Sequence, residues 1–148
     1  MEDDYMSDKA KVLPFDTAAG YTGIPNVILT HYQYFPKLNG NAVLVYAFLL
    51  KFYNADYGYA FPTQEQAARA LAMSDSTYRN AVKTLVQAQL IQTVENGGGA
   101  KNLVYYFRKP IEDEAEFFRM FPEAVENKRK QDAIWSNIGA KRKARVNI

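Results

Sequence analysis

The chain has 148 residues, 48% of them hydrophobic and 14% aromatic, and a formal net charge of +2. This length suits about one domain, and the apolar content excludes a mostly disordered chain. The absence of cysteine excludes disulfides and thiolate metal sites, so we expect a cytoplasmic protein. The single histidine, His31, leaves too few groups for a metal cluster or a Ser-His-Asp triad, and we expect it to pack or lie at the surface. No apolar run reaches the roughly 18 residues that a membrane span needs, and we expect no membrane partner.

Charge is unevenly distributed along the chain. Residues 1–20 carry five acids and two cations, whereas 61–110 carry six cations and three acids, and 123–148 seven cations and three acids. Such a separation indicates a candidate nucleic-acid footprint. We expect residues 1–20 to form a flexible acidic arm; the alternative is that this arm docks on a basic face of its own or of a neighbouring protomer.

The first ordered elements are predicted between residues 21 and 52. Pro25 and the apolar residues after it suit a strand end or a first helical turn. The aromatic residues of this segment predict core packing, with a dimer contact as the alternative. Residues 42–52 are apolar on nearly every face, which predicts a central core helix capped by Asn39 or Asn41.

A helix-turn-helix is predicted next. Thr63 and Gln66 have the spacing of a capping box, and apolar residues then recur at helical spacing for about two turns. Residues 71–73 form the turn, and Ser74 caps a second helix with Asp75 in its first turn. In the second helix the residues expected to face inward are Tyr78, Ala81, Val82 and Leu85, and those expected to face outward are Ser76, Thr77, Arg79, Asn80, Lys83 and Thr84.

A β-hairpin is predicted directly after the second helix. Residues 90–94 and 102–107 are rich in strand-forming side chains, and the glycine-rich loop 95–101 joins them. Residues 59–61 are expected to add a short strand. The fold class is therefore mainly α with a small β-hairpin: a winged helix-turn-helix over 21–110, followed by a C-terminal helical extension over 111–148.

Several motifs resemble the winged-helix domains of plasmid and phage replication proteins, of the DnaD amino-terminal and RepA amino-terminal type. They are FPTQE at 61–65, MSDST at 73–77 and LI at 90–91, with IPNVIL at 24–29 and NAVLVYAFLL at 41–50 upstream. The resemblance covers roughly residues 22–109. It implies a DNA-binding winged helix and a role for the aromatic segment before residue 36 in self-association.

The extension 111–148 is predicted to be helical. Acids open residues 111–121 and an aromatic stripe follows, Pro122 breaks or kinks the helix, and residues 123–137 resume it. This tail either folds back over the winged helix or lies against a second subunit. The basic cluster at 141–145 is either a solvated terminus or a phosphate contact.

The sequence contains no catalytic constellation. Ser74 and Ser76 have no histidine near them in the sequence, and the acids at 112–116 suit a helix start rather than a metal site. Gly97–Gly99 lacks the lysine of a phosphate-binding P-loop and joins two strands. We therefore expect a protein that is not an enzyme and that uses no cofactor or metal.

The predicted second helix of the helix-turn-helix offers a mechanism for DNA binding. A helix fits the major groove, where polar side chains of its amino-terminal half meet base edges. The predicted DNA-binding residues are Ser76, Thr77, Arg79, Asn80 and Lys83 for base edges, Gln64 and Ser74 for phosphates, and Asn96, Gly97 and Lys101 in the wing. Asp75 opposes this arrangement, because a carboxylate near phosphate is unfavourable. Two cations on the helix predict weak binding by one protomer, which a homodimer or higher homo-oligomer would strengthen.

We therefore predict a sequence-specific double-stranded DNA-binding protein of a plasmid, phage or other mobile element. It would act in replication initiation or transcriptional regulation, with replication proteins as further partners. The alternative is an oligomerisation or protein-interaction module of a primosome-like assembly that reads little DNA directly.

Overall fold

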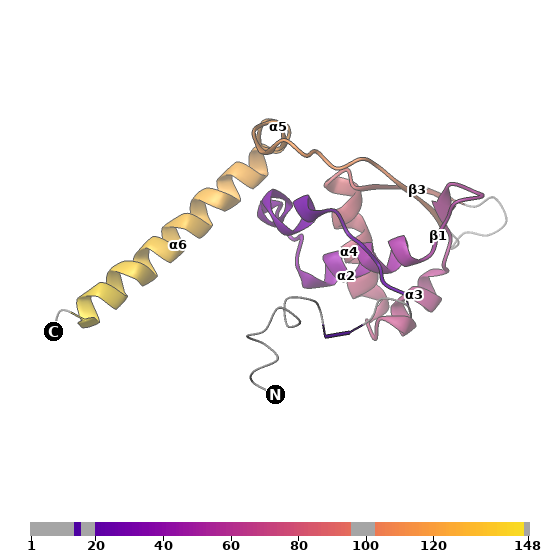
Figure 1. Ribbon diagram of the computed structural model, residues 1–148, viewed down its shortest axis with the longest axis horizontal. Coiled ribbons are helices and arrows are strands. Elements are labelled where there is room, and N and C mark those ends of the chain that lie inside the picture. Colours follow the sequence, from indigo (N-terminus) through magenta and orange to yellow (C-terminus); the bar gives the residue numbers. More distant parts are fainter. Residues whose placement is uncertain (1–13, 16–19, 96–102, 147–148) are drawn as a thin grey trace.

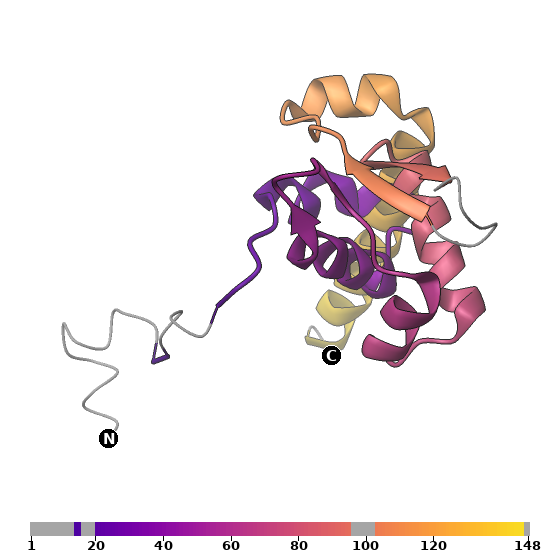
Figure 2. The ribbon, with the colours of Figure 1, turned by 90° about the vertical axis from the view of Figure 1, so that its right-hand side faces the viewer.

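The computed structural model of the chain describes residues 14–15, 20–95 and 103–146. Most of these residues form one body (Figure 1, Figure 2), and a long helix projects from it in the view of Figure 1. The elements in chain order are η2 (Asn26–Leu29), η3 (His31–Tyr34), α2 (Gly40–Lys51), β1 (Tyr53–Asn54), β2 (Tyr59–Ala60), α3 (Gln64–Ala70), α4 (Asp75–Gln87), β3 (Ile91–Glu95), β4 (Leu103–Phe107), α5 (Glu114–Met120) and α6 (Pro122–Val146). The predicted fold class, a winged helix-turn-helix with a helical extension, is confirmed. The predicted acidic arm lies almost entirely outside the described residues.

Helix α2 forms the centre of the core. Asn39 caps it by accepting a hydrogen bond from the Ala42 amide at 3.0 Å, which decides between the two candidate caps. Val45 and Leu49 are fully buried, and the helix packs against α4. Leu44, however, is 46% exposed, so α2 is not buried on every side as its composition predicts.

The helix-turn-helix forms as its caps predict. The Gln66 amide donates to the Thr63 hydroxyl and the Gln66 side chain accepts from the Thr63 amide, so both halves of the capping box are present. The turn after α3 contains Ala72 in the left-handed region (φ 53°). Ser74 then caps α4 by accepting from the Thr77 amide at 3.1 Å.

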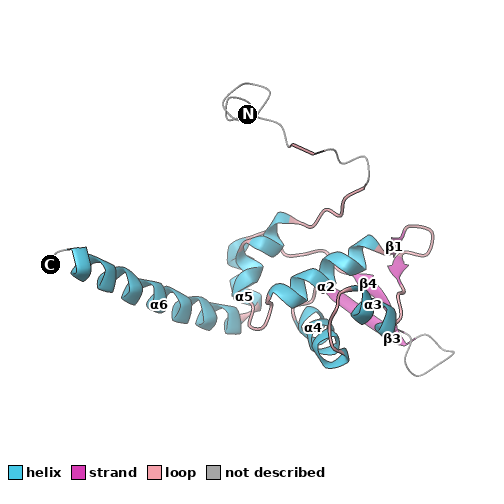
Figure 3. Ribbon diagram, turned by 90° about the horizontal axis from the view of Figure 1, so that it is seen from below, coloured by secondary structure: helices cyan, strands magenta, loops and turns pink. Residues whose placement is uncertain are grey.

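The sheet has four antiparallel strands in the order β1-β2-β4-β3. The predicted strand near residue 60 is confirmed, since Ala60 pairs with Tyr105 of β4. Strand β1 was not predicted, because two residues in an exit turn carry no period-2 pattern. Figure 3 shows the strands at one end of the body beside α3 and α4, whereas α6 leaves from the other end.

Helix α5 folds back onto the core. Phe117 and Phe121 are buried, and the segment before α5 is tied to η3 by two hydrogen bonds. The Ile111 amide donates to the Tyr32 hydroxyl, and the Ile111 carbonyl lies 2.7 Å from Nε2 of His31. Of the two roles expected for His31, packing or a surface position, the structure shows packing, at 5% exposure.

The predicted break at Pro122 is present, and helix α6 begins at that residue and contacts the core only near its start. Ala124 is its one buried residue among those described, and Asn127 donates to the Tyr34 carbonyl at 2.7 Å. The helix continues to Val146, beyond the predicted end at residue 137, and the basic cluster at 141–145 is helical and exposed. The extension thus folds back in its first part, and the remainder of α6 projects away (Figure 1). Among the described residues no helix is long and apolar enough to cross a membrane.

Candidate nucleic-acid interface

Helix α4 presents a polar outer face because its inner face is buried in the core. Tyr78, Ala81, Val82 and Leu85 are all at most 8% exposed, as predicted. The prediction for Thr84 is wrong. This residue is 5% exposed, and its hydroxyl donates to the Asn80 carbonyl at 3.1 Å, which satisfies the buried oxygen within the helix.

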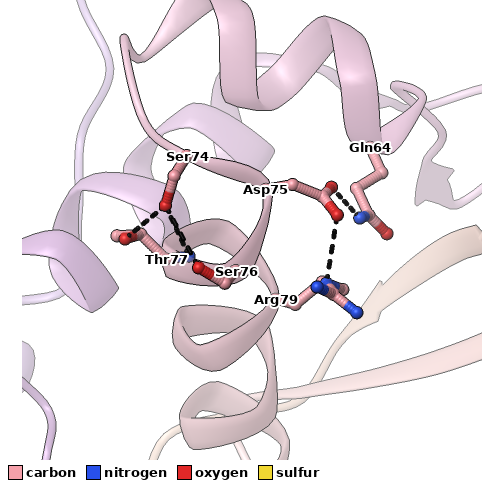
Figure 4. Close-up of polar contacts among 6 residues, drawn as sticks. All are labelled: Gln64, Ser74, Asp75, Ser76, Thr77 and Arg79. Carbon is pink, nitrogen blue, oxygen red and sulfur yellow. Dashed lines mark hydrogen bonds and ion pairs between the residues drawn. The ribbon is translucent and has the colours of Figure 1, made fainter.

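Three hydroxyl side chains gather at the start of α4 (Figure 4). The Ser74 hydroxyl accepts from the Thr77 amide, donates to the Thr77 hydroxyl at 2.8 Å and lies 3.3 Å from the Ser76 hydroxyl. Ser74 and Thr77 are thus engaged in the cap, so their hydroxyls have a structural role besides the predicted DNA contact. Ser76 is exposed beside them.

Asp75 holds two of the predicted DNA-binding side chains. Its carboxylate accepts a hydrogen bond from the Gln64 amide, and Nε of Arg79 lies 3.3 Å from Oδ2 (Figure 4). The Arg79 and Asp75 side chains are 60% and 62% exposed, so the pair stabilises the fold little. It does neutralise the one arginine of α4. Gln64 and Arg79 therefore have a partner that a DNA phosphate or base would have to replace.

Asn80 and Lys83 lie further along the same outer face. Both side chains are exposed, and no side-chain hydrogen bond or ion pair to either is found among the described residues. Both line a polar hollow of about 440 Å³ between α4 and the start of α2. These two residues are the ones of the predicted set that are presented without an intramolecular partner in the described part of the chain.

The wing is described only at its base. Asn96, Gly97 and Lys101, which were predicted to contact DNA, lie outside the described residues. Strands β3 and β4 pair from Ile91↔Phe107 to Glu95↔Leu103, so both strands of the predicted hairpin are present.

A buried pair of phenols joins α4 to the sheet. The Tyr78 hydroxyl donates to the Tyr105 hydroxyl at 2.9 Å, and both side chains are 1% exposed. Burial raises the pKa of both tyrosines. It also raises the pKa of Tyr46, in α2, to about 12 from the ordinary value of 10.0, with a smaller contribution from Tyr32.

These raised pKa values predict that the protein loses stability in alkali. The folded state favours the neutral phenol, so this part of the unfolding free energy is complete below pH 10 and is lost as the pH rises from 10 toward 12. For Tyr46 alone we expect a loss of about 3 kcal/mol over that window, at about 1.4 kcal/mol per pKa unit. Urea unfolding between pH 8 and pH 12 measures it. The Tyr46→Phe variant should lose less stability over the same range, and an equally steep fall would contradict the assignment.

No group of three histidine or acidic side chains that suits a metal ion occurs in the part of the chain that the structure describes.

Comparison with known families bears on the region around α4. Residues 37–91 match the family model of a helix-turn-helix domain. The helix-turn-helix domain thus runs from just before α2 to the first residue of β3 and includes α3 and α4. Domains of this class place the second helix of the helix-turn-helix pair against DNA. In this chain the pair is α3 and α4, so α4 is the helix that would enter a groove. No curated protein matches the chain. The match is to helix-turn-helix domains in general, so the narrower DnaD and RepA resemblance stays a prediction.

Proposed function

We propose that this protein binds double-stranded DNA in a sequence-specific manner, with α4 in the major groove and the wing over an adjacent groove. The observation that carries the proposal is the outer face of α4, the second helix of a helix-turn-helix domain. On that face Asn80 and Lys83 are exposed, three residues apart, and without side-chain partners among the described residues.

Each side chain has a chemical role in this proposal. The Asn80 amide offers one donor and one acceptor, the pattern that pairs with adenine N6 and N7. Lys83 is a point charge suited to phosphate or to guanine O6 and N7. Ser76 reaches a base edge or phosphate from the first turn. Gln64 and Arg79 join the interface only after leaving Asp75, so their contribution is smaller than their positions alone predict.

Helix α4 carries two cations, and Arg79 is paired with Asp75, which favours binding by more than one copy. Each phosphate contact contributes modest, salt-sensitive affinity, and two domains on repeated half-sites would restore it. We therefore propose a homodimer or higher homo-oligomer. The biological setting that the sequence resemblance implies is replication initiation or transcriptional regulation for a plasmid, phage or other mobile element, with replication proteins as further partners.

The second candidate function is a protein-interaction or oligomerisation module. The observation that favours it is α6, which projects from the body in Figure 1 and whose Ile134 and Trp135 are 51% and 62% exposed. Large apolar side chains on a projecting helix suit contact with another protein.

Selection of bound sequences from a random duplex pool, followed by affinity measurement, tests the first function. In the Asn80→Ala variant we expect roughly tenfold weaker binding to the selected sequence and a relaxed preference at one base pair, because a bidentate contact supplies about 1–3 kcal/mol of discrimination. Asn137→Ala removes the same amide from an exposed position on α6 and should leave binding unchanged. If the wild-type protein enriches no sequence, or Asn80→Ala binds as the wild type does, the groove-reading role is wrong and the interaction module gains support.

A further inference from the structure

We propose that the hollow between the start of α2 and the outer face of α4 is a binding site for the DNA backbone, in which Lys37 and Lys83 hold a phosphate group. This inference rests on the proposed DNA-binding function and deepens it, because it assigns the side of α4 along which the duplex backbone runs. Lys37 was not among the residues that the sequence pointed to.

The hollow has a polar lining and is large enough to admit a phosphate group of a duplex. Its volume is about 440 Å³, and its polar lining comes from both helices and from the residues just before α2. The side chains that can donate hydrogen bonds into it include those of Lys37, Asn41, Asn80, Lys83 and Gln87. All five residues are exposed, so a phosphate on a duplex outside the protein can reach them.

Charge distinguishes this side of α4 from the other side. No carboxylate lines the hollow, and among the described residues no ion pair includes Lys37 or Lys83. A second pocket lies on the α3 side of α4. Two arginines line it, and each of them is paired with an acid. Arg69 lies 2.9 Å from Glu65, and Arg79 lies 3.3 Å from Asp75. The positive charge that remains to attract a phosphate is therefore on the α2 side.

The backbone around Lys37 is fixed by its neighbours. Phe35 and Leu38 are 5% and 4% exposed, and the Leu38 amide donates to the Phe35 carbonyl at 3.1 Å, which closes a tight turn. Lys37 lies in this turn with a φ of 67°. A turn anchored by two core side chains holds the lysine backbone in place before the ligand arrives, which lowers the entropic cost of binding.

This placement implies a direction for the duplex. In many helix-turn-helix proteins the first helix of the pair crosses the backbone. Here that helix is α3, whose last-turn arginine is already paired with an acid of its own helix. The backbone that flanks the groove read by α4 therefore runs past the start of α2.

The salt dependence of binding to a non-cognate duplex of 20 base pairs tests the assignment. Each phosphate contact contributes about 0.9 to the slope of log K against log salt concentration. We expect Lys37→Gln and Lys83→Gln each to reduce the slope by about that amount, so that the difference in affinity from wild type narrows about threefold between 50 and 200 mM salt. The double variant should lose about twice as much slope, and Lys37→Arg, which keeps the charge, should retain the wild-type slope.

Lys51→Gln is the matched control, because Lys51 lies at the opposite end of α2 and the change in net charge is the same. The proposed phosphate site is wrong if the folded Lys37→Gln variant keeps the wild-type slope of log K against log salt concentration. It is also wrong if Lys51→Gln loses as much of that slope as Lys37→Gln does. If Asn80→Ala still alters sequence preference in that case, the proposed function stands and only this inference fails. If the wild-type protein binds no duplex at any salt concentration, the proposed function fails with it.

Discussion

Replacing Phe117 with alanine should lower the free energy of unfolding by about 3–5 kcal/mol, because it opens a cavity at the junction between α5 and the body. Phe117 is fully buried, and its ring centroid lies 4.6 Å from that of Tyr32, 4.8 Å from that of His31 and 5.2 Å from that of Phe121. The loss removes contacts that hold the extension to η3. Urea unfolding followed by far-ultraviolet circular dichroism measures it.

Phe15→Ala is the matched control for this substitution. Phe15 is 65% exposed, so removing the same ring there should change the unfolding free energy by less than about 0.5 kcal/mol. Comparable losses in the two variants would show that Phe117 does not have the packing role given to it.

Replacing Asp75 with asparagine should strengthen DNA binding by about 10- to 100-fold at low salt. The change removes a negative charge from the face that meets the duplex, and it frees Arg79 and Gln64 from the carboxylate that holds them. A freed arginine that reaches a guanine or phosphate supplies about 1–3 kcal/mol. Helix α4 should become slightly less stable, by about 0.3–1 kcal/mol, because Asp75 complements the positive end of the helix. Affinity and stability are thus expected to change in opposite directions.

Glu126→Gln controls for net charge in the Asp75 experiment. Glu126 is paired with Arg129 at 2.6 Å on α6, so the variant also removes one acid from an arginine pair, but away from α4. A duplex-binding titration of both variants separates local from global charge. Equal gains in the two would mean that net charge, and not the release of Arg79, determines affinity.

The local features of the DNA-binding helices could be predicted from sequence because their causes lie within three or four residues. The Thr63–Gln66 capping box and the Ser74 cap depend only on spacing along the chain, and both formed as expected. The inward positions of α4 followed from a 3.6-residue period. Thr84 was misplaced because a threonine hydroxyl can be satisfied within its own helix, which a polar-outward pattern does not take into account.

The arrangement of charge around α4 could not be predicted in the same way. Gln64 lies eleven residues before Asp75, and only the folded angle between α3 and α4 brings their side chains together. Lys37 lies in a turn before α2 and reaches the hollow beside Lys83 through packing of α2 on α4. Periodicity assigns residues to a face of one helix, but it does not show what a neighbouring helix places beside that face.

In the extension, too, the sequence pattern does not show which neighbouring element a helix face contacts. An aromatic stripe predicted a helix within residues 111–121, and that helix buries Phe117 while Phe121 is buried at its end. Nothing in the pattern of α6 marks where packing ends, because apolar residues continue beyond the buried Ala124 to Ile134 and Trp135, which are exposed. The helix leaves the body because η3 offers contacts only to its first turns.

The position of Trp135 has a practical consequence. It is the only tryptophan of the chain, and it is 62% exposed on α6, the helix that projects from the body (Figure 1). Indole fluorescence from this protein therefore reports on α6 and on whatever approaches it, and it should change little when the core unfolds. The buried phenols of Tyr32, Tyr46, Tyr78 and Tyr105 are the optical reporters of the core, so the two chromophores follow two different parts of the same chain.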